Sequence, residues 1–284
     1  MKKMRKLLPA FAMLLVSAIM LSTASFAWFS TNTRATAGGM KVQATTSGGL
    51  AIAFAIPDAS SNPIAPSNDN YKSSVTLADT DWTNDGYKLN PTSVKVDGSA
   101  WYTASADKTD VYSGAKGTWS QVTTNQNQYY FKSALYVRSL NEETTGDALF
   151  VDKINVTTGT GSGSQLEKAL RVAIHTGSTW LFFAPNYTEG SVDVTTFKYV
   201  SGITGDGENT EGTTSNYTAT QLYLGQNALT GAQLLAAGTN GVKYDNPTQV
   251  EVYVYFEGED TNCTSALAYD LRDLIVEVTF TTTD

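Results

Sequence analysis

The segment TQVEVYVYFEGED, residues 248–260, has the clearest strand pattern in the chain. Its apolar residues alternate with polar and aromatic ones: Val250, Val252, Val254 and Phe256 against Glu251, Tyr253, Tyr255 and Glu257. Successive side chains of a β-strand point to opposite faces, so a period of two predicts a strand here. The β-branched and aromatic residues that fill the segment favour the same structure.

The same signal recurs on both sides of this segment. Strands are predicted where apolar residues alternate or run together between glycines, prolines and polar turns, at residues 38–46, 48–57, 128–140, 148–158, 171–177, 179–185 and 273–283. The polar turn NEETTGD indicates that 128–140 and 148–158 form a hairpin. The strand at 179–185 is expected to pair with 171–177.

Helical patterns are few and short. Ser164 followed by Glu167 has the spacing of a capping box and predicts a short helix before the strand at 171–177. Short helices are also predicted at 228–238 and at 263–271, where Asn262 could cap the second.

Many strands, few helices and no alternation of strand and helix predict an all-β fold. We expect a jelly-roll-like antiparallel β-sandwich with two or three short helices and long loops. Residues 60–70 and 186–219 are polar and rich in turn formers, and they are predicted to be surface loops. No linker of distinct composition separates two cores, so residues 28–284 are expected to form a single domain.

Residues 1–27 have the layout of a secretory signal peptide. The basic residues Lys2, Lys3, Arg5 and Lys6 precede an apolar run at residues 7–21, and small and polar residues follow up to Ala27. Signal peptidase is therefore expected to cut between Ala27 and Trp28. The alternative is an uncleaved, membrane-tethered protein, because the stretch at 7–29 is long enough to span a bilayer.

Charge and cysteine usage narrow the function classes. The formal net charge of −8 becomes −12 when the four basic residues leave with the signal peptide, which argues against nucleic acid as a partner. The single cysteine, Cys263, excludes an intrachain disulfide. Export without disulfides favours a secreted protein at the exterior of a Gram-positive bacterial cell.

Catalytic motifs are missing from the sequence. His175 is the only histidine, and it alternates with Ala173 as a solvated or packed strand residue would. Cys263 has no base nearby in the sequence and is interpreted as a small buried residue. We therefore predict no catalytic residues, no enzyme activity and no cofactor.

Two weaker site hypotheses remain. Glu257, Glu259 and Asp260 form the densest group of oxygen ligands, but a solvated strand end with a helix cap is favoured over a metal site. A carbohydrate platform could use the aromatic residues Trp101, Tyr102, Tyr129 and Tyr130, although packing in a sandwich explains them as well.

The two ends of the chain resemble a known family. The signal peptide runs into ASFAWFSTNTRATAGGMKVQATT, and the chain closes with VEVYVYFEGEDTNCTSALAYDLRDLIVEVTFTT. An aromatic just after the cleavage site, a short polar stretch, a glycine-introduced first strand and an alternating last strand are similar to those of the TasA/camelysin group of exported Gram-positive proteins. The middle of the chain, residues 58–247, shows no such resemblance.

The resemblance implies a jelly-roll subunit of extracellular biofilm fibres. In that family the N-terminal segment of one mature subunit inserts as a strand into its neighbour. Carried over, the donor strand is WFSTNTRATA, residues 28–37, with Trp28, Phe29, Thr31, Thr33 and Ala35 in contact with the next subunit. The implied partners are other copies of the chain in a head-to-tail homopolymer, related fibre subunits and a signal peptidase, with membrane contact only through the leader. Camelysin-type members are assigned protease activity, yet no set of zinc ligands is visible here.

A binding function is the principal alternative. A monomeric surface adhesin or carbohydrate-binding β-sandwich would share the export signal and the fold. It would differ in remaining monomeric at high concentration.

Overall fold

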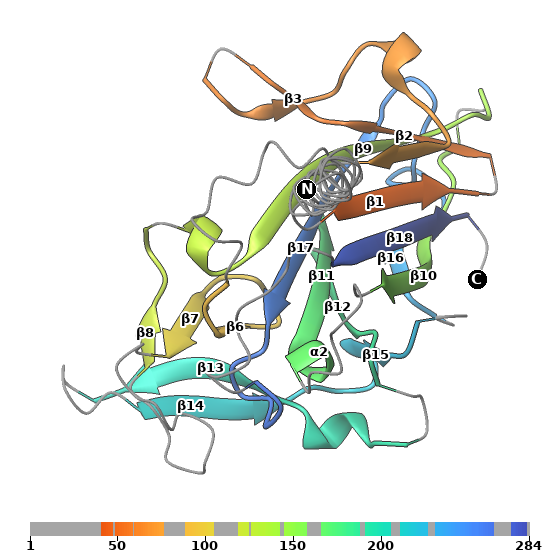
Figure 1. Ribbon diagram of the computed structural model, residues 1–284. Coiled ribbons are helices and arrows are strands. Elements are labelled where there is room, and N and C mark those ends of the chain that lie inside the picture. The colour runs from red at the N-terminus through yellow and green to blue at the C-terminus, as the bar shows by residue number, and fades with distance from the viewer. Residues whose placement is uncertain are drawn as a thin grey trace, which may run out of the picture. The chain divides into compact units, whose positions relative to one another are not determined.

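The computed structural model describes residues 41–47, 49–58, 60–76, 89–104, 119–124, 126–142, 145–157, 166–187, 191–205, 211–226, 231–263 and 274–282 (Figure 1). The chain divides into two units, residues 1–38 and residues 39–284. All described residues belong to the second unit. The predicted leader and donor strand therefore lie outside the described residues. In the part of the chain described here, no helix has the length and hydropathy needed to cross a membrane.

Two large β-sheets form the body of this unit. The five-stranded sheet has the order β16 (Gln233–Leu235), β10 (Leu149–Thr157), β18 (Ile275–Thr281), β1 (Lys41–Thr46) and β5 (Ser74–Thr76). The six-stranded sheet has the order β15 (Leu222–Leu224), β12 (Thr179–Ala184), β11 (Leu170–Thr176), β17 (Thr248–Phe256), β9 (Phe131–Ser139) and β2 (Leu50–Phe54). The chain crosses between the sheets from β9 to β10 to β11 and again from β16 to β17 to β18, as in a jelly roll. The predicted all-β sandwich is thus confirmed.

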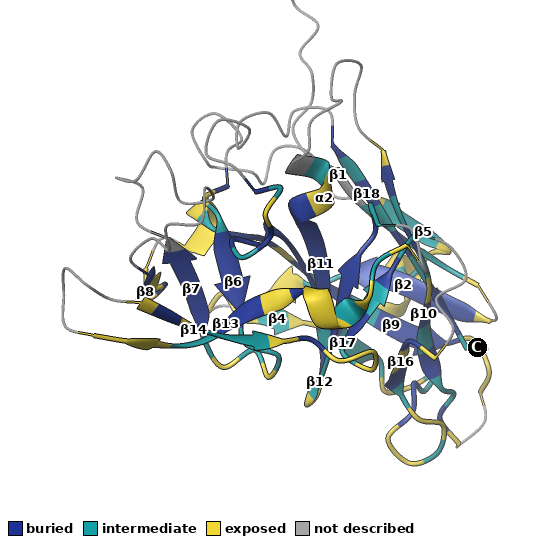
Figure 2. Ribbon diagram, turned by 90° about the horizontal axis from the view of Figure 1, so that it is seen from below, coloured by how far each residue is buried: buried dark blue, intermediate teal, exposed yellow. Residues whose placement is uncertain are grey.

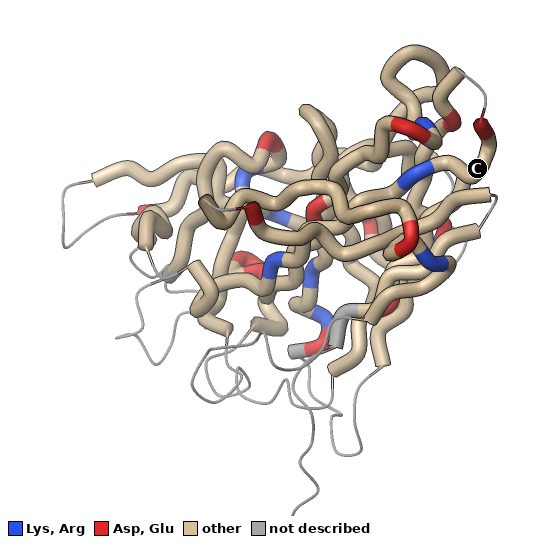
Figure 3. Tube along the Cα trace, turned by 90° about the horizontal axis from the view of Figure 1, so that it is seen from above, with Lys and Arg blue, Asp and Glu red and all other residues tan. Residues whose placement is uncertain are grey.

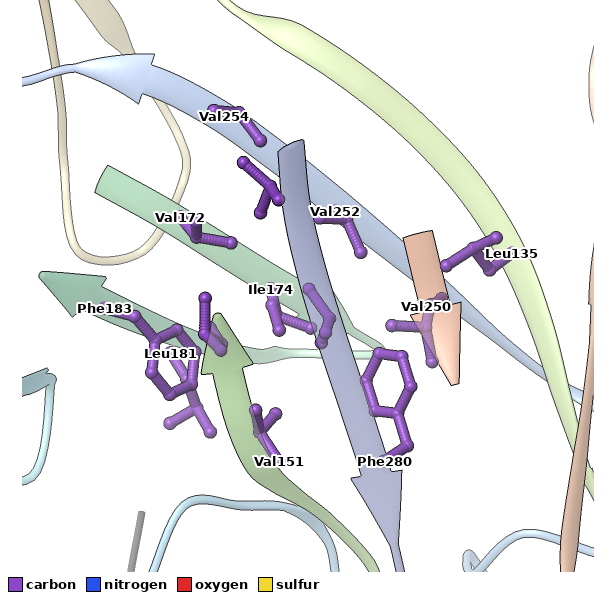
Figure 4. Close-up of a cluster of buried hydrophobic side chains, with 14 of the residues drawn as sticks. Leu135, Val151, Val172, Ile174, Leu181, Phe183, Val250, Val252, Val254 and Phe280 are labelled. Atoms are coloured by element: carbon purple, nitrogen blue, oxygen red, sulfur yellow. The ribbon is translucent and has the colours of Figure 1, made fainter. Parts of the chain in front are cut away.

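The main hydrophobic core lies between these two sheets. Val250, Val252 and Val254 of β17 face it together with Ile174 of β11 and Phe280 of β18 (Figure 4). All five side chains are buried. Fully burying an apolar side chain of this size stabilises the fold by about 1.5–3 kcal/mol relative to leaving it exposed.

The outer face of the six-stranded sheet is also buried. Tyr253 and Tyr255, on the face of β17 opposite the valines, pack against Trp101, Tyr130 and Tyr217 in a second cluster. Small sheets supply this cover: β6 (Thr92–Val94), β7 (Trp101–Ala104) and β8 (Trp119–Gln121) in one, β13 (Lys198–Thr204) and β14 (Glu211–Asn216) in the other. The dark blue of β6, β7 and β17 in Figure 2 shows this second buried layer.

Several local predictions are wrong. The strands predicted at 128–140 and 148–158 form as β9 and β10 but lie in different sheets, so they do not make a hairpin. The stretch at 186–219, predicted to be a surface loop, contains the hairpin of β13 and β14, and Tyr199, Val200 and Tyr217 of this region are buried. The sheets are also not entirely antiparallel, because β1 pairs parallel with β18 and β12 pairs parallel with β15.

The described helices are very short. The helix predicted from Ser164 and Glu167 forms as α2 (Leu166–Ala169) and leads directly into β11, which pairs with β12 as predicted. The helix predicted at 228–238 is wrong over its described part, which contains β16. The helix predicted at 263–271 lies outside the described residues from 264 onward. Single 3₁₀ turns occur at η1 (Asn68–Asn70), η3 (Gln126–Gln128) and η4 (Val194–Thr196).

Candidate functional site

The candidate site is a groove where β2 ends beside β9. The ladder between β2 and β9 runs from Leu50↔Ser139 to Phe54↔Leu135, whereas β17 pairs with β9 as far as Phe131. The carbonyl of Ala134 accepts one further hydrogen bond, from the Ala55 N–H at 3.0 Å. The edge of β9 at Lys132 and Ser133 therefore extends beyond the end of β2.

An apolar groove of about 630 Å³ lies along this extension. It is lined by residues of β2, β3, β4 (Pro63–Ile64), β5 and β9 and of the connections between β2, β3 and β4: Phe54, Ala55, Ile56, Pro57, Ser61, Pro63, Thr76, Phe131, Lys132, Ser133 and Ala134. A strand edge beside an apolar surface can bind an extended peptide, since its backbone groups give affinity and the groove receives side chains.

A short β-arm forms one wall of the groove. In it β3 (Ile56–Pro57) pairs with β4 (Pro63–Ile64), and β3 projects from the body in Figure 1. Ile56 and Ile64 are directly paired and 45% and 42% exposed, which makes the arm an unusually apolar surface element. Asp58 holds the turn, because its Oδ1 accepts hydrogen bonds from the N–H groups of Ser60 and Asn62 at 2.8 Å each. These bonds lower the pKa of Asp58.

Charged groups flank the groove at Lys132. Its ammonium lies 2.6 Å from Glu251 Oε1, while Glu251 Oε2 is 3.0 Å from His175 Nδ1 and accepts from the Tyr253 hydroxyl at 2.8 Å. Partial burial raises the pKa of Glu251, but the hydrogen bonds from Lys132, His175 and Tyr253 outweigh this effect and lower it overall. Acidic and basic residues are interspersed along the described trace (Figure 3), with no basic stripe of the kind that nucleic acids bind.

The predicted interaction residues cannot be placed on this surface directly. Ala27, Trp28, Phe29, Thr31, Thr33 and Ala35 all lie outside the described residues. The two segments that carry the family resemblance do meet in their described parts, because β1 and β18 pair in register from Lys41↔Ile275 to Thr46↔Phe280.

The acidic cluster is not the solvated strand end that the sequence predicts. Glu257 is 1% exposed and Asp260 is 8% exposed, and only Glu259 is partly accessible. Asp260 instead forms an ion pair with the fully buried Arg171, with Asp260 Oδ2 and Arg171 Nη2 2.6 Å apart. The described residues contain no group of three or more His, Cys, Asp or Glu side chains suited to a metal ion.

Three of the four predicted carbohydrate-platform aromatics are buried. Trp101, Tyr102 and Tyr130 are each less than 9% exposed, and only Tyr129 is partly accessible. They are packing residues, because the centroids of the Trp101 and Tyr130 rings lie 4.1 Å apart within the second cluster. The prediction of a carbohydrate platform built from these four residues is therefore wrong.

The two other singled-out residues behave as the sequence predicts. His175 is a packed strand residue of β11, stacked on Trp180 with 4.4 Å between ring centroids. Cys263 is fully buried.

The sequence did not indicate the groove or the partner of Arg171. The groove depends on where β2 leaves β9, which no local pattern encodes. The one available signal for the ion pair was a charged residue inside the apolar strand LRVAIHT.

Comparison with protein-family models, with curated proteins and with solved structures finds no match to this chain.

Proposed function

We propose that the protein is an exported structural subunit of the bacterial cell surface or biofilm matrix. After cleavage between Ala27 and Trp28, residues 28–37 of one copy would add as a strand to the groove of the next copy. The observation that carries this proposal is the groove along the β9 edge at Lys132 and Ser133, just beyond the last pair of β2.

The physics of the groove suits such an occupant. Lys132 and Ser133 of β9 span about 7 Å, enough to align with roughly two residues of an added strand. The arm residue Ile56 and the strand residue Phe131 supply apolar surface for large side chains. Trp28 and Phe29 would be the anchors, since each buries on the order of 150–250 Å². Each copy would donate its strand to the next copy, so its own groove would remain free to accept the strand of a third. Repetition of this head-to-tail contact builds an open filament.

Cleavage is the first requirement of this function. We expect the native extracellular protein to begin at Trp28, because the small residues Ser25 and Ala27 form the signal-peptidase site. Mass spectrometry of the intact protein from the culture medium or cell surface tests this. A protein that retains Met1 would instead be the membrane-tethered alternative.

Strand donation predicts a specific loss of filaments. Deleting residues 28–37 from the mature protein should abolish filaments in electron micrographs while circular dichroism remains β-rich, because the deletion lies outside the described sandwich. The half-buried Ala134 lines the groove, and Ala134→Arg should reduce filament formation at least tenfold by placing a charge at the anchor site.

A matched control separates the groove from a general effect of charge. Ala237→Arg adds the same charge at an exposed position after β16 and should leave filaments unchanged. Filaments that persist without residues 28–37 would refute strand donation. A wild-type protein that stays monomeric at high concentration would favour the surface adhesin.

A further inference from the structure

The strand that covers the β9 edge stops pairing just before a proline. The last hydrogen bond from this segment to β9 is the one that the Ala55 N–H donates to the Ala134 carbonyl at 3.0 Å. If the register of the ladder continued, Pro57 would lie opposite Lys132. Pro57 instead belongs to β3, which pairs with β4.

The backbone groups of this segment show why the ladder ends there. Ile52 exchanges two backbone hydrogen bonds with Lys72, at 2.7 and 2.9 Å, so its N–H and C=O point away from β9. The odd-numbered residues therefore face β9, as the bond from Ala55 shows. Pro57 has the next odd-numbered position, where an N–H would have to donate to the Lys132 carbonyl. Proline has no N–H, so the ladder cannot continue through it.

The same alternation fixes which backbone groups of β9 face the groove. The carbonyl of Ala134 points toward β2, and by alternation the backbone groups of Ser133 point toward β17, where Ser133 pairs with Val252. The N–H and C=O of Lys132 thus point to the side where β2 has ended, and Lys132 and Pro57 both line the groove there. An added strand would meet the backbone of β9 at Lys132.

The side chain of Lys132 does not protect this edge. Lysines on exposed edge strands commonly hinder the approach of another strand. Here the ammonium lies 2.6 Å from Glu251 Oε1 and 5.3 Å from the centroid of the Tyr253 ring. Both partners belong to β17, which lies on the side of β9 opposite β2. The charge is therefore held away from the position of an added strand.

The β-arm is fixed in its place as a wall of the groove. The hydroxyl of Tyr136, a residue of β9, donates to the Pro63 carbonyl of β4 at 3.1 Å. At the turn between β3 and β4, the Asp58 N–H donates to the Asn62 carbonyl at 2.8 Å. These bonds hold β3 on β4, so the arm does not take the place of an extended β2.

We propose that Pro57 keeps the β9 edge at Lys132 open for an added strand, supplied by residues 28–37 of a second copy. The inference rests on the proposed function and specifies its contact point. A residue of the donor would take the ladder position that Pro57 cannot fill, and its N–H and C=O would bond to the backbone of Lys132.

Hydrogen exchange of the Lys132 amide tests the role of Pro57 separately from filament formation. In the mature protein, diluted until light scattering shows monomers, this amide should exchange at close to the rate of an unprotected peptide. Pro57 is exposed, and Pro57→Val supplies the missing N–H and a residue that favours strands. β2 should then extend and slow the exchange of Lys132 at least tenfold. A slowly exchanging amide in wild type, or equal rates in the two proteins, would overturn the inference.

Pro63→Val is the matched control, because Pro63 pairs with Pro57 in the arm but lies outside the register of β2. It should leave both the exchange of Lys132 and the filaments unchanged. Pro57→Val should reduce filaments in electron micrographs at least tenfold, because the extended β2 would occupy the position of the donor. Equal loss of filaments in both variants would indicate a general effect of the arm and overturn the specific role of Pro57.

The two readouts separate this inference from the proposed function. If Pro57→Val slows the exchange of Lys132 but assembles normally, Pro57 does end the ladder, and strand donation to this groove is refuted. If Pro57→Val changes neither readout while deletion of residues 28–37 abolishes filaments, strand donation stands and the role of Pro57 is refuted.

Discussion

Replacing Asp260 by asparagine is expected to lower the free energy of unfolding by about 3–5 kcal/mol, the range typical of breaking a buried ion pair from one side. Arg171 is 0% exposed and its Nη2 lies 2.6 Å from Asp260, so the variant would leave a guanidinium in the interior without its counter-charge. Because a domain is stabilised by only about 5–15 kcal/mol in total, the loss should be plain in urea denaturation followed by fluorescence.

The pair Lys95 and Asp97 is the matched control. Its charged atoms are 3.5 Å apart, and the two side chains are 32% and 58% exposed. Solvent screens such a pair, so Asp97→Asn should cost less than about 1 kcal/mol. Equal losses for Asp97→Asn and Asp260→Asn would contradict a special role for burial.

A double variant distinguishes the lost charge from lost packing. Arg171→Met with Asp260→Leu removes both charges and keeps apolar volume, and it should be more stable than Asp260→Asn alone. A double variant less stable than the single one would mean that the other partners of Asp260, Tyr187 and Asn262, contribute more than the ion pair does.

The strands of the core could be predicted from the sequence because their signal is local. In 248–260 the valines alternate with larger polar and aromatic residues, and β17 forms there with the valines in the main core. The same reasoning located β9, β10, β12 and β18, whose apolar runs are bounded by turn residues.

The pairing of these strands could not be predicted in the same way. A polar turn between two strands suggests a hairpin, but in a jelly roll the chain crosses to the opposite sheet there, as it does between β9 and β10. The composition of 186–219 led to a wrong prediction of a surface loop, because β13 and β14 are rich in glycine and threonine. In the structure, Tyr199 and Tyr217 bury their rings against the outer face of the six-stranded sheet.

The candidate sites could not be predicted without knowledge of the fold. Glu257 and Asp260 look like surface acids in the sequence, and only the outer layer of small sheets encloses them. The isolated bridge between Thr92 and Glu257 places β6 beside the end of β17. The β9 groove likewise exists only because β2 ends its ladder at Leu135.

Glu257 should make the protein less stable as the pH rises through neutrality. Burial raises the pKa of this carboxyl to about 8, from the ordinary 4.5 of a glutamate in water. The nearby charge of Arg171 acts in the opposite direction but does not compensate for the lost solvation. At neutral pH the folded protein therefore holds a proton on Glu257 that the unfolded chain has released.

The proton on Glu257 determines how the free energy of unfolding changes with pH. Below about pH 4.5 the carboxyl is protonated in both the folded and the unfolded protein. The free energy of unfolding then does not change with pH through this group. Between pH 4.5 and 8 unfolding releases a proton, so each unit of pH lowers the free energy of unfolding by about 1.4 kcal/mol through this group. Above pH 8 both states are ionised and the contribution becomes constant.

Glu257→Gln removes this titration and keeps an oxygen that can accept from the Glu259 N–H, which lies 3.1 Å from Glu257 Oε1. Urea denaturation of both proteins between pH 5.5 and 7.5 should show wild type losing about 3 kcal/mol relative to the variant, at about 1.4 kcal/mol per pH unit. Other ionisable groups are common to both proteins and cancel in the difference.

Glu251→Gln provides a control of opposite sign. The pKa of Glu251 is lowered, so its stabilising contribution is fully present above the unfolded value of 4.5 and is lost as the pH falls through its folded pKa. The difference between wild type and Glu251→Gln should therefore shrink in acid, as the pH falls below 4.5. Parallel curves for wild type and Glu257→Gln across neutrality would show that Glu257 is ionised in the folded protein. Arg171 would then balance two carboxylates, Glu257 and Asp260, within one buried cluster.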